Sequence, residues 1–196
     1  MASILVVCSG NICRSPVAEG LLRRGVQRRF GAEAPVVSSA GTIGLEGSAA
    51  TRESVEAAGE RGVDIALHIA RRLTDAMVED ADLVVCMAAE HRAEIGARVP
   101  AATERTFTLK ELVRLLEGDA PDAPQADDVI AARVASAAVS RRNKGPSNPF
   151  DEDIVDPLGM PLETYRAIAW ELDEWTDRLV AGLYGPVPAG VPGESA

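Results

Sequence analysis

Apolar residues in this chain form short unbroken runs that alternate with segments of helical periodicity. Strands are predicted over 3–7 and 82–87, because residues 4–7 and 83–87 form the unbroken apolar runs typical of strands buried on both faces. The segments 36–40 and 105–109 predict two further strands. Apolar residues at helical spacing predict helices over 16–30, 49–61, 89–98, 109–117 and 161–184. Strands that alternate with helices predict an α/β fold, a three-layer sandwich with helices on both faces of a parallel sheet.

Residues with capping chemistry mark several helix ends. Ser48 is expected to cap the helix over 49–61, and Thr74 to cap a brief helix that ends at Asp80. Gly31 is expected to end the helix over 16–30, because glycine adopts the backbone conformation that closes a helix.

The alternation of strands and helices breaks between residues 118 and 150. Residues 118–124 are a turn-rich linker, and the alanine-rich stretch 127–141 predicts an accessory helix. We expect a single domain over 1–184 with a surface insertion at about 118–150; a lid or a partner-docking segment is the alternative. The tail 185–196 is rich in proline and glycine and is expected to be disordered.

The candidate chemistry lies between the first strand and the first helix. Cys8 follows the apolar run, Arg14 stands six residues later, and Pro16 suits the first turn of a helix. The backbone N–H groups of such a loop can surround one anion, and the arginine adds a fork for phosphate oxygens. The field that attracts phosphate also favours thiolate over thiol, so Cys8 is a candidate nucleophile.

The string Cys-Ser-Gly-Asn-Ile-Cys-Arg-Ser-Pro, residues 8–16, resembles the signature loop of low-molecular-weight protein tyrosine phosphatases of the bacterial type. The resemblance implies a four-stranded parallel sheet in the order 2-1-3-4. It also implies hydrolysis of phosphotyrosine through a cysteinyl-phosphate intermediate on Cys8. The phosphate-binding loop would consist of Ser9, Gly10, Asn11, Ile12, Cys13, Arg14 and Ser15.

A thiolate that attacks phosphorus leaves an oxygen that needs a proton, so a carboxylic acid should face the loop. The candidates are Asp151, Asp153 and Asp156. Only Asp156 precedes a proline, Pro157, and this pair resembles the Asp-Pro loop that supplies the family's general acid. Asp156 would then act as the base that activates water against the intermediate.

Further residues match the family's pattern one by one. Ser15 would donate its hydroxyl hydrogen to the Cys8 sulfur, and Asn11 would hold the loop with a positive φ angle. Ser39 and His68 match the positions that hydrogen-bond this asparagine. In the family a cysteine at the position of Cys13 can form a disulfide with the nucleophile under oxidant, which predicts reversible peroxide inactivation.

The walls of the expected cleft depart from the family. Leu45 and Leu158 stand where aromatic side chains are usual, and Ile12 completes an aliphatic wall. Some bacterial relatives remove phosphate from arginine and carry threonine at the position of Ile12, so isoleucine favours phosphotyrosine. A protein-arginine phosphatase is the alternative, followed by an arsenate reductase, which needs further cysteines, and a non-catalytic phosphate-binding module.

Charge and composition limit the partners. The net charge of −10 argues against nucleic acid and anionic membranes, so the expected partner is a phosphorylated protein or peptide. Three cysteines without a leader or a spanning apolar run predict a cytoplasmic protein. His68 and His91 lack metal-ligand spacing, and we expect no metal and no cofactor. The oligomeric state does not follow from the sequence.

Overall fold

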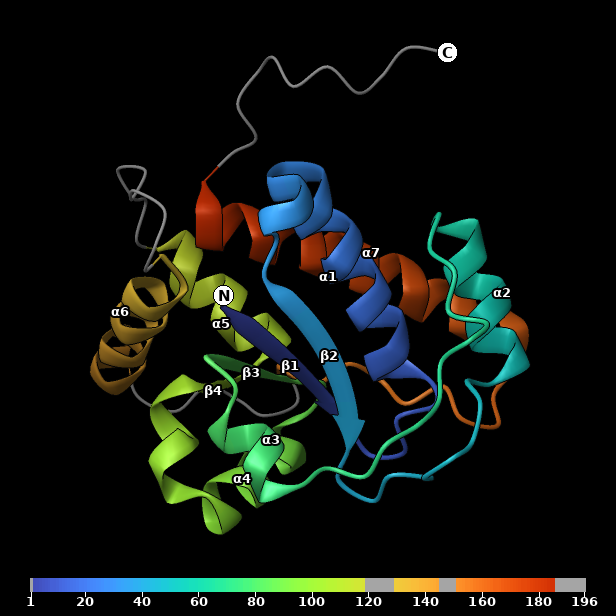
Figure 1. The fold of residues 1–196 in the computed structure, drawn as a ribbon, viewed down its shortest axis with the longest axis horizontal. Helices are drawn as coiled ribbons and strands as arrows, with labels where there is room; N and C mark the ends of the chain where they lie inside the picture. Colours follow the sequence, from blue (N-terminus) through green and yellow to red (C-terminus); the bar gives the residue numbers. More distant parts are fainter. Residues whose placement is uncertain (1, 119–128, 145–150, 186–196) are drawn as a thin grey trace.

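The computed structural model describes residues 2–118, 129–144 and 151–185. Its centre is one sheet of four parallel strands in the order β2-β1-β3-β4, which confirms the expected order (Figure 1). The strands are β1 (Ser3–Cys8), β2 (Val36–Gly41), β3 (Leu83–Cys86) and β4 (Thr106–Thr108). The carboxyl ends of all four strands therefore meet at one edge, where α/β sheets bind their ligands.

Helices cover both faces of the sheet, as the alternation predicts (Figure 1). Ile4, Val6 and Cys8 of β1 belong to one apolar core, and Leu5 and Val7 belong to the other. The first core includes side chains of α1 (Arg14–Phe30), α2 (Arg52–Glu60), α5 (Leu109–Glu117) and α7 (Leu162–Tyr184). The second includes side chains of α3 (Asp75–Glu79) and α4 (Ala89–Arg98). The fold is thus a three-layer sandwich.

The helices lie where they were expected, although α1 begins at Arg14 rather than at residue 16 and the cap of α2 differs. Thr74 caps α3 as expected, through a bond from the backbone N–H of Met77. Ser48 as the cap of α2 is wrong: the cap is Thr51, whose hydroxyl accepts from Ser54 N. Ser48 is engaged elsewhere, because its carbonyl accepts from Ala70 N within a short backbone pairing of two loops. Two 3-10 helices, Gly31–Glu33 and Pro100–Arg105, were not predicted from the sequence.

The accessory helix expected over 127–141 is present as α6 (Val129–Lys144). One side of it joins the first core through Val129, Ile130, Val134, Ala137 and Ala138. At its other end Arg141 donates to the carbonyl of Thr106 at 2.9 Å and lies over the Phe107 ring. Helix α6 therefore packs against the edge strand β4. The expected linkers around it fall largely on 119–128 and 145–150, and the tail on 186–196, all outside the described residues.

Candidate active site

The loop that carries the candidate chemistry joins β1 to α1 at the carboxyl edge of the sheet. Cys8 is the last residue of β1 and Arg14 is the first residue of α1. The loop passes so close to β2 that a Cβ atom on Gly41 would lie 2.5 Å from the carbonyl oxygen of Ser9. Glycine at this position therefore lets the loop approach the end of the neighbouring strand.

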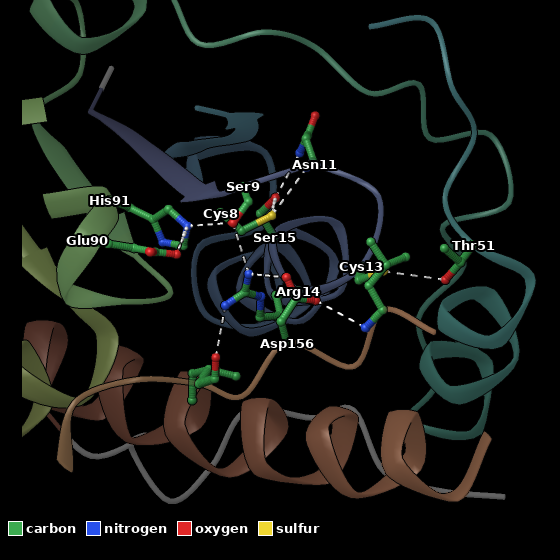
Figure 2. Close-up of polar contacts among 12 residues, drawn as sticks. Cys8, Ser9, Asn11, Cys13, Arg14, Ser15, Thr51, Glu90, His91 and Asp156 are labelled. Carbon is green, nitrogen blue, oxygen red and sulfur yellow. Dashed lines mark hydrogen bonds and ion pairs between the residues drawn. The ribbon is translucent and has the colours of Figure 1, made fainter. Parts of the chain in front are cut away.

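The sulfur of Cys8 lies in a polar environment at the base of this loop (Figure 2). The backbone N–H of Asn11 donates to it at 3.3 Å, and the Ser15 hydroxyl lies 2.9 Å away. The residue as a whole is buried. Two donors directed at one buried sulfur stabilise negative charge on it.

Asn11 connects the loop to its surroundings. It has a φ angle of 58°, and its side-chain oxygen accepts from Arg71 N at 2.8 Å, which fixes the orientation of the amide. The amide nitrogen then donates to the hydroxyls of Ser15 and Ser39, each at 2.8 Å. Because the Ser15 oxygen accepts from Asn11, its own hydrogen is directed to the Cys8 sulfur.

Ser39 and His68 hold Asn11 from two other segments. The Ser39 hydroxyl accepts from the Asn11 amide and donates to Glu19 on α1 at 2.5 Å. The ring Nε2 of His68 lies 2.8 Å from the backbone carbonyl oxygen of Asn11. The structure thus brings both expected supporting residues to the asparagine, His68 at its main chain.

Arg14 is buried and bound on three sides (Figure 2). One terminal nitrogen, NH1, donates to the carbonyl of Ile154 at 3.0 Å. The other, NH2, donates to a carboxylate oxygen of Asp156 at 2.5 Å and to the Ser9 hydroxyl at 3.2 Å. These bonds hold the guanidinium plane between the loop and the segment that carries Asp156.

The segment that carries Asp156 is anchored on α4 and β3. The carboxylate of Asp153 accepts from Ala89 N at the start of α4, at 2.8 Å. The backbone N–H of Ile154 donates to the carbonyl of Met87 at 2.8 Å, just after β3. Asp153 therefore serves the helix terminus, and Asp151 is exposed, whereas Asp156 alone of the three candidates contacts Arg14.

Cys13 lies on the side of Arg14 that faces Thr51, opposite to the side on which His91 lies (Figure 2). Its sulfur is 3.7 Å from the Thr51 hydroxyl, the residue that caps α2. Burial raises the pKa of the Cys13 thiol, although hydrogen bonds from Thr51 and Ser54 act in the other direction.

The three residues expected to form the pocket wall differ in exposure. Leu45 is 43% exposed and Leu158 is 55% exposed, so both can meet a substrate. Ile12 is buried and belongs to the first core. Any wall at this site is therefore formed mainly by the two leucines.

One residue of the site was missed from the sequence. His91 lies in the first turn of α4, is buried, and has its ring Nε2 2.9 Å from the Ser9 hydroxyl (Figure 2). Burial, and next the charge of Arg14, lower the pKa of His91 to about 4, so the ring is neutral at neutral pH. The sequence could have indicated His91 by its position shortly after β3, because β3 is the neighbour of β1 in the sheet.

The described residues lack both a cluster of metal ligands and a membrane-spanning helix. They contain no group of three or more His, Cys, Asp or Glu side chains that could hold a metal ion. Separately, none of the helices in the described ranges is both long and apolar enough to cross a bilayer.

Comparison with known proteins gives consistent matches. Residues 3–137 match the model of the family described as low molecular weight phosphotyrosine protein phosphatase. The probable low molecular weight protein-tyrosine-phosphatase EpsP of Ralstonia solanacearum is 43% identical over 112 residues, 56% of this chain and 72% of that protein. A protein-arginine-phosphatase of Geobacillus stearothermophilus is 33% identical over 180 residues, 92% of this chain and 95% of that protein.

Solved structures agree with this result. A low molecular weight protein tyrosine phosphatase from T. tengcongensis superposes with a TM-score of 0.68 at 31% identity, covering 92% of this chain and 98% of that one. The YwlE arginine phosphatase from Geobacillus stearothermophilus gives a TM-score of 0.66 at 32% identity, covering 92% and 91%.

Proposed function

The chain belongs to the low molecular weight phosphotyrosine protein phosphatase family, and from this we propose that it hydrolyses phosphotyrosine in proteins through a covalent intermediate on Cys8. The observation that carries the proposal is the ion pair between Arg14 and Asp156. It joins residues 142 positions apart and brings a candidate acid to the loop that holds the candidate nucleophile.

The first step is transfer of the phosphoryl group to sulfur. The backbone N–H groups of the loop and the guanidinium of Arg14 bind the phosphate oxygens, which replace the Asp156 carboxylate at NH2. The Cys8 thiolate attacks phosphorus, and the bond from phosphorus to the tyrosyl oxygen breaks. Asp156, protonated, gives its hydrogen to that oxygen.

The second step hydrolyses the cysteinyl-phosphate and regenerates the free enzyme. Asp156, now a carboxylate, takes a proton from water as the water attacks phosphorus, and the S–P bond breaks to release inorganic phosphate. The departing sulfur is again a thiolate, and the hydrogen bonds from Asn11 N and the Ser15 hydroxyl stabilise it. These bonds keep the sulfur ionised before the first step, and in the second step they stabilise it as the leaving group.

The pocket supports an aromatic phosphoester. Leu45 and Leu158 are exposed aliphatic side chains that can pack against a phenyl ring, although without the gain of about 1 kcal/mol from an aromatic pair. Ile12 gives the loop no hydroxyl group that could recognise a guanidinium. Both features favour phosphotyrosine over phosphoarginine.

Removal of phosphate from arginine is the second candidate activity. The observation in its favour is the similarity to the Geobacillus protein-arginine-phosphatase, which extends over 92% of this chain, whereas the match to EpsP covers 56%. The arguments against it are the aliphatic side chains of Leu45 and Leu158 and the lack of a hydroxyl group at Ile12.

The test compares kcat/KM on p-nitrophenyl phosphate, a phosphotyrosine peptide and a phosphoarginine peptide, for the wild type, Cys8→Ser and Ile12→Thr. We expect the wild type to prefer phosphotyrosine, Cys8→Ser to lose all turnover, and Ile12→Thr to shift the ratio toward phosphoarginine. Turnover that survives in Cys8→Ser contradicts the mechanism. A wild-type preference for phosphoarginine contradicts the substrate assignment and leaves the mechanism intact.

The proposed activity has consequences for regulation by oxidants, for the partners of the protein and for its location. Cys13 as the disulfide partner of Cys8 under oxidant stays a prediction, and the raised pKa of the Cys13 thiol disfavours oxidation of Cys13 itself. Membership of the family implies a phosphorylated protein as substrate and phosphate as product. The acidic net charge supports a partner other than nucleic acid or an anionic membrane. We place the protein in the cytoplasm because its three cysteines are free.

A further inference from the structure

We propose that His91 is a positioning residue of the phosphatase reaction, which acts through the Ser9 hydroxyl to hold the phosphate-binding edge of Arg14. The inference rests on the proposed function for its catalytic consequence. The geometry that carries it is the chain from His91 Nε2 to Ser9 Oγ, 2.9 Å, and from Ser9 Oγ to Arg14 NH2, 3.2 Å.

The direction of these hydrogen bonds follows from donor chemistry. Arginine can only donate, so the Ser9 oxygen accepts from Arg14. The neutral ring of His91 carries one hydrogen, on either Nε2 or Nδ1, and the network must decide which. Among the described residues Nδ1 has no hydrogen-bond partner. An orphaned buried donor is rarer than an orphaned acceptor, which favours hydrogen on Nε2.

The surroundings of Nε2 support the same assignment. A carboxylate oxygen of Glu90, the preceding residue on α4, lies 3.5 Å from Nε2. A carboxylate oxygen near the ring nitrogen favours an N–H over a lone pair at that position. His91 Nε2–H therefore donates to Ser9, and the Ser9 oxygen accepts from both His91 and Arg14.

This arrangement limits the freedom of the arginine terminus that the proposed mechanism uses. NH2 is the nitrogen that binds Asp156, and it is the one we expect to bind a phosphate oxygen. With Ile154 O fixing NH1 and Ser9 fixing NH2, the fork keeps its plane when the carboxylate is exchanged for phosphate. A group held in advance in its binding geometry loses less entropy on binding.

His91 itself is well placed for a fixed role. It lies in the first turn of a ten-residue helix and is 2% exposed. The start of that helix is tied to the Asp156 segment by the bond between Ala89 N and Asp153. Helix α4 therefore positions two parts of the site at once, the acid-bearing segment through Asp153 and the arginine through His91 and Ser9.

The experiment compares His91→Gln, whose amide nitrogen can replace Nε2–H, with His91→Leu, which fills the volume without a donor. Both are made in the wild type and in Ser9→Ala, and Ile95→Val serves as a control for packing of α4. The readouts are kcat/KM on p-nitrophenyl phosphate, the Kd of inorganic phosphate by calorimetry, and Tm.

We expect His91→Leu to weaken phosphate binding and kcat/KM about tenfold, His91→Gln to retain most of both, and Ile95→Val to leave both unchanged. In the Ser9→Ala background His91→Leu should add little, because the bond that it removes is already gone. An undiminished loss in that background, or a lower Tm with unchanged phosphate affinity, overturns the inference. Failure of the wild type to hydrolyse phosphoesters would contradict the proposed function alone, since phosphate binding still tests His91.

Discussion

Asn11 combines an unusual backbone conformation with three side-chain hydrogen bonds. Its φ of 58° is one that asparagine tolerates better than most residues but that glycine adopts without strain. Its amide bonds reach Arg71, Ser15 and Ser39, and the bond to Ser15 directs a hydrogen to the Cys8 sulfur. The residue therefore contributes to the shape of the loop and to the charge on sulfur by separate means.

Two substitutions separate these contributions. Asn11→Gly keeps the backbone conformation and removes the amide, whereas Asn11→Ala removes the amide and adds backbone strain. We expect Asn11→Ala to lower the free energy of unfolding by about 1 kcal/mol more than Asn11→Gly, and both to lower kcat on p-nitrophenyl phosphate. Urea unfolding and steady-state kinetics measure the two effects. Wild-type kcat in Asn11→Gly would show that the amide has no part in catalysis.

Whether a site residue could be predicted depended on how its partners are spaced in the sequence. Cys8 and Arg14 belong to one continuous motif, and Asp156 precedes a proline, so the sequence predicts a role for all three. The bond of His91 to Ser9 spans 82 residues and has no motif around it. Helix α4 lies beside the loop only because β3 is the neighbour of β1 in the sheet. The sequence pattern predicts the helix but not which of its side chains contacts the loop.

At the scale of elements, the apolar runs predicted β1 and β3 well because these two strands are buried almost throughout. The error at Ser48 arises from a contact between residues that are distant in the sequence. Ser48 and Thr51 have similar capping chemistry, and a backbone bond from Ala70, a residue distant in sequence, engages Ser48 in a loop. Local propensity could not separate the two residues, since the deciding contact is not local.

Helix α6 shows what an inserted segment contributes to the fold. Strand β4 lies at the edge of the sheet, where backbone groups lack a neighbouring strand, and α6 reaches it through Arg141. The bond from Arg141 to Thr106 O satisfies one of these groups directly. We therefore assign α6 a structural role, which favours the insertion over the alternative of a lid.

Two valines of α6 test this role. Val134 is 7% exposed and belongs to the core, whereas Val139 on the same helix is 47% exposed. We expect Val134→Ala to lower the free energy of unfolding by about 1–3 kcal/mol, because it removes buried methyl groups. Val139→Ala should change it little, and both variants should keep wild-type kcat/KM. Urea unfolding measures the stabilities; a loss of activity without loss of stability would return α6 to a role at the active site.

At the scale of the whole molecule, the sheet topology assembles the site from distant segments. The junction of β1 and α1 supplies Cys8 and Arg14, the first turn of α4 supplies His91, and the segment before α7 supplies Asp156. All converge on the carboxyl edge of the sheet, where parallel α/β folds bind their ligands. The buried polar groups that this convergence requires make the stability of the molecule depend on pH.

His91 provides the clearest case of this dependence. Its pKa is about 4 in the folded protein, against 6.5 for a free histidine, because burial and the charge of Arg14 outweigh Asp153 and Asp156. Below pH 6.5 the unfolded chain binds a proton that the folded protein does not. Stability is therefore lost as the pH falls from about 6.5 to about 4. A difference of this size corresponds to about 2 kcal/mol between pH 7 and pH 5.

His91→Gln isolates this contribution, since other titrating groups are common to both proteins. Urea unfolding at about pH 7 and about pH 5 gives the free energy of unfolding of each. We expect the wild type to lose about 2 kcal/mol more than His91→Gln over this interval. An equal loss in both proteins would mean that His91 is protonated in the fold at pH 5. The ring that donates to Ser9 through Nε2–H would then be a cation, and the assignment of a neutral ring at this site would be wrong.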